Sequence, residues 1–192
     1  MECDWEFDIG ADAPVIDALW PGLVDLRAEP GRVQSLPEAA ELPALADALV
    51  MLNGPESGVW TSKCDLWTEQ EFDRDELDAG AADAMFSLAC YIDVLPASVS
   101  DWATADDVGD WTRRARDAMR LAPLRNCRID LVIRAAHLRN EGFDFGVTAY
   151  AIGCGASPEQ SADALSKALL VFTQSVVALA NGSKYNEKSS GE

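Results

Sequence analysis

The chain of 192 residues lacks the clustered side chains that usually mark a metal or redox site. It contains one histidine, His137, and no C-x-x-C pair. Its five cysteines are scattered: Cys3, Cys64, Cys90, Cys127 and Cys154. A zinc site needs closely spaced ligands, and a redox couple needs paired cysteines. We therefore expect no metal and no cofactor, and we interpret the cysteines as small buried apolar residues.

Long hydrophobic runs are also missing. Polar residues interrupt the most apolar stretch, residues 162–180, so no uninterrupted run of about 20 apolar residues could cross a bilayer. The first six residues are acidic where a secretory signal would be basic and then apolar. The glycines do not match the spacing of dinucleotide-binding or phosphate-binding loops. We expect a cytoplasmic protein without a membrane segment.

Basic residues are scarce, with 15 Lys and Arg against 33 Asp and Glu, for a net charge of −18. A chain this negative repels phosphate backbones and anionic membranes, which counts against nucleic-acid binding. Residues 1–110 hold 25 acids and four bases, whereas residues 111–139 hold eight arginines and two aspartates. These arginines either pair with surplus acids inside the fold or form a cationic patch for an anionic ligand. Strong acidity is also typical of proteins from a salt-adapted or high-GC source. In that case the net charge would affect solubility and would say nothing about mechanism.

The periodicity of apolar residues predicts four strands and four helices. Alternation predicts strands over residues 2–9, 59–68, 128–138 and 143–152, the last two joined by a turn at 140–142. In 59–68, Trp60, Cys64 and Leu66 are expected on one face. Helical spacing and start signals predict helices over 37–52, 81–92, 104–122 and 157–181, with caps at Ser35, Thr104 and Ser157 and an end at Asn181-Gly182.

Each predicted strand has one apolar face, which favours an α+β fold: a mainly antiparallel sheet of about four strands with helices packed on one face. With 48% apolar residues and no linker in the middle, we expect one domain over residues 1–182. Residues 183–192 are expected to form a flexible polar tail.

The polar faces of the predicted strands would meet on the side of the sheet without helices. They carry Lys63, Asp65, Arg128, Asp130, Arg134, Asp144, Thr148 and Tyr150. One interpretation is a solvated face with cross-strand ion pairs. The other is a binding surface on which Arg134 and Lys63 hold anions and Tyr150 contacts the ligand.

Two other features are candidate sites. Cys154 lies in a glycine-bearing turn before a predicted helix, where exposed amides can activate a thiol, and His137 could serve as its base. The alternative is a buried cysteine beside a packing glycine. Of the six tryptophans, Trp20 and Trp67 are the expected exposed anchors for a partner, and the others are expected in the core.

Two functional hypotheses remain open. The first is a non-enzymatic protein-interaction module, of inhibitor, immunity or adaptor type, that engages a basic partner through its acidic surface. The second is a small enzyme or anion-binding domain that uses the polar sheet face or the Cys154 turn. The absence of a clear nucleophile and base favours the first, and a homo-oligomer is compatible with either.

Overall fold

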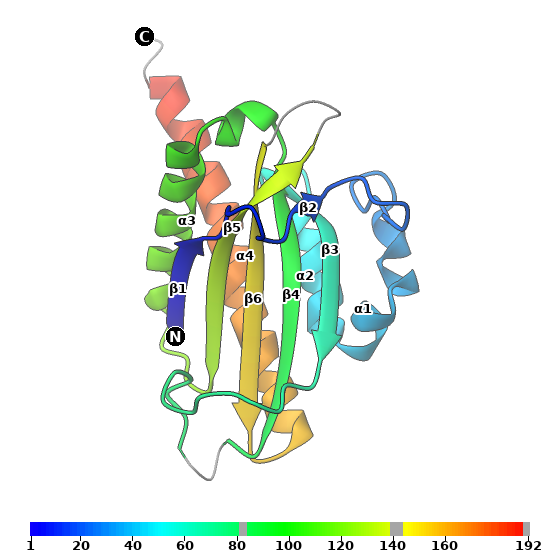
Figure 1. Cartoon of the computed structure of the whole chain (residues 1–192), viewed down its shortest axis with the longest axis vertical. Helices are drawn as coiled ribbons and strands as arrows, with labels where there is room; N and C mark the ends of the chain where they lie inside the picture. The colour runs from blue at the N-terminus through cyan, green and yellow to red at the C-terminus, as the bar shows by residue number, and fades with distance from the viewer. Residues whose placement is uncertain (81–83, 139–143, 190–192) are drawn as a thin grey trace.

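A computed structural model describes residues 1–80, 84–138 and 144–189, and in these residues six strands form one sheet with helices packed on one side (Figure 1). The strands are β1 (Glu2–Phe7), β2 (Ile16–Asp17), β3 (Val59–Trp67), β4 (Phe86–Pro96), β5 (Cys127–His137) and β6 (Asp144–Gly155). The helices are α1 (Pro37–Glu41), α2 (Pro43–Leu52), α3 (Ala105–Arg120) and α4 (Pro158–Ser189), with short 3-10 turns η1 (Pro30–Ser35) and η2 (Val99–Trp102).

The strand order is β1-β5-β6-β4-β3, and β2 lies beside β5 beyond the end of β1. The four long strands pair antiparallel, while β1 and β2 run parallel to β5. This confirms the predicted α+β class with a mainly antiparallel sheet, although the described residues form six strands where about four were expected. The predicted turn at 140–142 lies outside the described residues.

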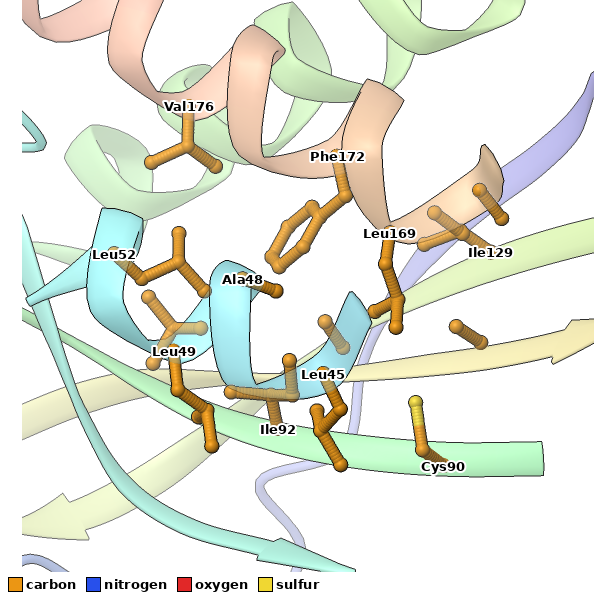
Figure 2. Packing of buried hydrophobic residues seen from close by; sticks show 14 of the residues in the cluster. Leu45, Ala48, Leu49, Leu52, Cys90, Ile92, Ile129, Leu169, Phe172 and Val176 are labelled. Atoms are coloured by element: carbon orange, nitrogen blue, oxygen red, sulfur yellow. The ribbon is translucent and has the colours of Figure 1, made fainter. Parts of the chain in front are cut away.

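The hydrophobic core lies between the sheet and helices α2 and α4. Phe172 and Val176 of α4 point towards Leu49 and Leu52 of α2, above Ile92 of β4 (Figure 2). All five side chains are at most 2% exposed. Burying a side chain of this kind contributes about 2 kcal/mol, so this layer supplies much of the stability.

Helix α4 is the longest element of the structure. Within its stretch Pro158–Asn181, an 18-residue window has a mean hydropathy of 1.4, so by length and composition this stretch could cross a membrane. In the fold, its apolar stripe packs on β6 and α2, the position of a core helix. The helix starts as predicted, since the Ser157 hydroxyl accepts the Gln160 N–H. It continues past Asn181-Gly182, where an end was predicted, to Ser189.

The predicted helix over 81–92 is wrong, because Phe86–Pro96 form strand β4, which lies between β6 and β3. Residues 81–83 lie outside the described part. Cys90, Ile92 and Val94 face the helices and alternate with Tyr91 and Asp93, which is the pattern of a strand. Near its ends, β4 also buries apolar residues on the face away from the helices. Because both faces are partly apolar, the sequence of this strand does not alternate clearly between apolar and polar residues.

The predicted helix over 37–52 is broken at Leu42-Pro43. Leu42 adopts φ −124° and ψ 98°, because a residue before proline is pushed out of the helical region. The expected Ser35 cap is also absent: the Ser35 hydroxyl donates to the Arg32 carbonyl oxygen. By contrast, Thr104 forms the predicted cap of α3: its hydroxyl accepts the Asp107 N–H, and the Asp107 carboxylate accepts the Thr104 N–H.

Strand β3 changes phase in its middle. Its register with β4 shifts between Thr61 and Cys64, which marks a β-bulge. Trp60 therefore packs with Leu95 on the side away from the helices, whereas Cys64 packs against the main core. The expectation that Trp60 and Cys64 share a face is wrong for this reason.

Candidate functional site

The side of the sheet without helices is covered at both ends and polar in its centre. The segment after β1 crosses one end, where Ile16 and Ala18 pack with Trp60 (Figure 1). The segment after β3 crosses the other end, where Leu77 packs with Cys154. We call the polar centre the open face. It consists of Asp4, Glu6, Lys63, Asp65, Tyr91, Asp93, Arg128, Asp130, Arg134, Thr148 and Tyr150.

Strand register brings distant residues of the open face into one row. Asp4 is opposite Asp130, Asp130 opposite Tyr150, Tyr150 opposite Tyr91, and Tyr91 opposite Asp65. Neighbouring strands lie about 4.8 Å apart, so adjacent members of this row are close enough to act on one ligand. The row thus has carboxylates at both ends and two tyrosines in its middle.

The two arginines of the open face are paired with carboxylates of their own chain. Arg134 is only 7% exposed; its Nη1 lies 2.5 Å from Oδ2 of Asp8, and its Nη2 donates to the Tyr150 hydroxyl at 3.3 Å. Arg128 Nε donates to both oxygens of Asp130 at 2.8 and 2.9 Å, and this bond raises the pKa of Arg128. The positive charges on this face are therefore largely neutralised.

The remaining cation of the open face, Lys63, lies beside an aromatic ring. Its Nζ is 5.1 Å from the ring centroid of Trp20, a distance at which an ammonium attracts the ring face. The Trp20 indole N–H donates to the Ser62 carbonyl oxygen at 3.2 Å, which fixes the ring over strand β3. Trp20 is therefore half-buried and engaged within the chain.

Asp93 lies almost buried at the centre of the face, with 7% of its surface exposed. The Thr148 hydroxyl donates to its Oδ1 at 2.7 Å. Burial raises the pKa of Asp93, and this effect outweighs the Thr148 hydrogen bond and the charges of Lys63 and Arg134, which lower it.

A row of aromatic rings crosses the same face. The ring centroids of Trp67 and Tyr91 are 6.3 Å apart, and those of Tyr91 and Tyr150 are 6.0 Å apart. Burial raises the pKa of Tyr91 to about 12, so this phenol stays neutral at physiological pH. The half-buried Trp67 donates its indole N–H to Glu69 at 3.1 Å.

A cleft of about 370 Å³ lies on the open face above β1 and β5. Val132, 6% exposed, lies in it between the two arginines of β5. Its polar lining is Asp4, Glu6, Arg128, Asp130, Arg134 and Tyr150.

Most of the predicted face residues are brought together: Lys63, Asp65, Arg128, Asp130, Arg134, Thr148 and Tyr150 lie on the open face. Asp144 lies towards the end of the sheet, paired with Ala136. The predicted set lacked Asp4, Glu6 and Asp8 of the first segment, and Tyr91 and Asp93 of β4. The alternation of residues 2–9 and 90–94 was the signal that could have added them.

The structure does not bring Cys154 and His137 together. Cys154 is 1% exposed and packs against Leu77, while His137 is exposed at the far end of β5. Cys127 pairs with Gly153, the neighbour of Cys154. His137 lies at the other end of β5, ten positions further along the strand, a span of about 30 Å. Burial also raises the pKa of Cys3, Cys64 and Cys90 to about 12. Among the described residues, no group of three or more His, Cys, Asp or Glu side chains could hold a metal ion.

Comparisons of the chain with known protein families, with curated proteins and with solved structures give no match.

Proposed function

We propose that this chain is a non-enzymatic interaction module, of inhibitor, immunity or adaptor type, that binds a basic protein partner on its open face. One observation carries the proposal. The arginines of the face are paired within the chain, whereas Asp4, Glu6 and Asp65 are exposed beside a row of aromatic rings.

The charge of the chain supports the same partner chemistry. A net charge of −18 attracts basic proteins at long range and speeds their association. A few well-packed residues then supply most of the binding free energy, and such anchor residues are often aromatic. Trp67, Tyr91 and Tyr150 supply such anchors between the carboxylates, and their ring faces attract cations.

The face is a better docking surface than the edges of the sheet. On edge strand β1, the Trp5 N–H donates to the side chain of Asp4 at 2.8 Å; on edge strand β3, the Leu66 N–H donates to Asp65 at 2.8 Å. An added strand would have to displace these side chains. A partner that lies across the face leaves both bonds intact.

An anion-binding function is less well supported. An anion on Arg134 would compete with Asp8, and one on Arg128 would compete with Asp130. Breaking a partly buried ion pair leaves a charge without its partner, which costs free energy before any ligand binds. The surrounding carboxylates would also repel the anion.

The proposal is tested by capturing a panel of purified basic and acidic proteins on the immobilised chain. We expect basic proteins to bind at about 50 mM salt and to be lost at about 500 mM, since screening removes long-range attraction. Asp65→Lys reverses a charge on the open face, and Glu41→Lys makes the same change at an exposed residue of α1, outside the open face. Capture should fall strongly with Asp65→Lys and little with Glu41→Lys.

Two results would contradict this function. Capture that does not depend on salt would exclude an electrostatic partner. Equal loss with Asp65→Lys and Glu41→Lys would show that net charge acts without the open face.

A further inference from the structure

The cleft on the open face combines an apolar floor with carboxylate walls. On this face of β5, Val132 lies between Asp130 and Arg134. In the strand register, Glu6 of β1 is opposite Val132. Tyr150 closes the side towards β6. A side chain that fills this space needs an apolar stem over Val132 and a cationic head between Glu6 and Asp4.

The charge balance of the cleft favours a cation. Arg128 pairs with Asp130 and lies 3.3 Å from Glu76, and Arg134 pairs with Asp8. Glu6 and Asp4 are two further carboxylates beside these ion pairs, and both side chains are exposed. Carboxylates thus outnumber guanidinium groups around the cleft, and a bound cation would reduce their mutual repulsion.

The shape and the aromatic wall favour a guanidinium over an ammonium. A guanidinium is planar, donates to two carboxylates at once and stacks on aromatic rings while losing little hydration. The chain already uses this contact elsewhere: the Arg27 guanidinium carbon is 3.9 Å from the ring centroid of Trp60, and that of Arg113 is 5.7 Å from the ring of Trp5.

We propose that this cleft seats an arginine side chain of the basic partner, with its stem over Val132, its guanidinium between Asp4 and Glu6, and one flat side towards Tyr150. The inference rests on the proposed function, because it names the anchor residue that the partner places on the open face. It predicts that recognition requires an arginine and not merely a positive charge.

The test measures affinity for two probes, nona-arginine and nona-lysine peptides of equal charge, by titration calorimetry. The cleft variant is Asp4→Asn with Glu6→Gln; the amide oxygen introduced by Asp4→Asn can still accept the Trp5 N–H. The control is Glu41→Gln with Asp47→Asn, which removes the same charge from two exposed helix residues outside the open face. We expect the cleft variant to weaken nona-arginine binding about fivefold or more, and the control less than about twofold.

The outcomes separate the inference from the function on which it rests. Nona-lysine binding as tight as nona-arginine, or equal weakening in both double variants, would overturn the arginine site and leave a basic partner in place. No binding of either peptide at low salt would overturn both proposals. Tighter nona-arginine binding that only the cleft variant weakens supports the site.

Discussion

Arg134 Nη1 lies 2.5 Å from Oδ2 of Asp8, and this contact joins residues 126 positions apart in the chain. It ties the segment that follows β1 to β5, the strand within the arginine-rich residues 111–139. The pair also joins the two oppositely charged parts of the sequence. On the open face, an arginine from residues 111–139 is neutralised by an acid from residues 1–110.

Arg134→Ala should therefore destabilise the fold. The guanidinium side chain is 9% exposed and Asp8 is 41% exposed, so the loss is smaller than for a fully buried pair. We expect about 2 kcal/mol less unfolding free energy, measured by urea denaturation. Arg32→Ala removes the exposed Arg32–Glu29 pair, 3.8 Å apart, and should cost less than about 0.5 kcal/mol. If both substitutions lowered the unfolding free energy equally, the Arg134–Asp8 pair would contribute no more to stability than an exposed pair.

Asp93→Asn should stabilise the protein at neutral pH. A carboxyl whose pKa is higher in the folded chain than in the unfolded chain binds its proton more tightly when folded. Its ionisation therefore costs stability as the pH rises through the folded pKa. Asparagine carries no charge, and its amide oxygen can still accept the Thr148 hydroxyl.

The gain from Asp93→Asn should be absent below the ordinary aspartate pKa of 3.8 and should grow towards pH 7. Denaturation of both proteins at several pH values measures this difference. Thr148→Val is the companion variant: it removes the hydroxyl that lowers the pKa of Asp93, and should destabilise most at neutral pH. If Asp93→Asn lost more stability at pH 7 than at pH 4, attraction to Lys63 and Arg134 would outweigh burial.

Much of the open face could be predicted from alternation along single strands. Arg128, Asp130 and Arg134 alternate with large apolar residues, so the sequence places them on the polar side of β5. Asp93 and Tyr91 were missed because their strand also buries Leu95 on that side, which makes its pattern resemble a buried helix.

Other features depend on contacts between distant segments. The choice of Asp8 as the partner of Arg134 depends on β1 lying parallel to β5, which no local pattern specifies. The bulge that turns Trp60 away from Cys64 depends on the pairing of β3 with β4. The break before Pro43, by contrast, follows from a local rule and was available in the sequence.

Gly153→Ala should loosen the contact between α4 and the sheet. A Cβ at Gly153 would overlap the backbone nitrogen of Leu165 and lie 2.6 Å from the Ser161 carbonyl oxygen. Backbone atoms of a helix cannot move aside cheaply, so we expect a loss of about 3 kcal/mol in chemical denaturation. Gly10→Ala is the control, since a Cβ there has no atom within 4 Å. A neutral Gly153→Ala would mean that α4 shifts easily on β6.

Asp65 protects the outer edge of β3, because its carboxylate accepts the Leu66 N–H at 2.8 Å. Unpaired donors on an edge strand invite pairing with another chain. Asp65→Ala should therefore increase self-association, measured by sedimentation velocity over a concentration series. Asp65→Asn removes the same charge but keeps an acceptor oxygen, and should sediment like the wild type. If both variants associated equally, the lost charge would be the cause; if neither did, the Leu66 N–H would not be a pairing site.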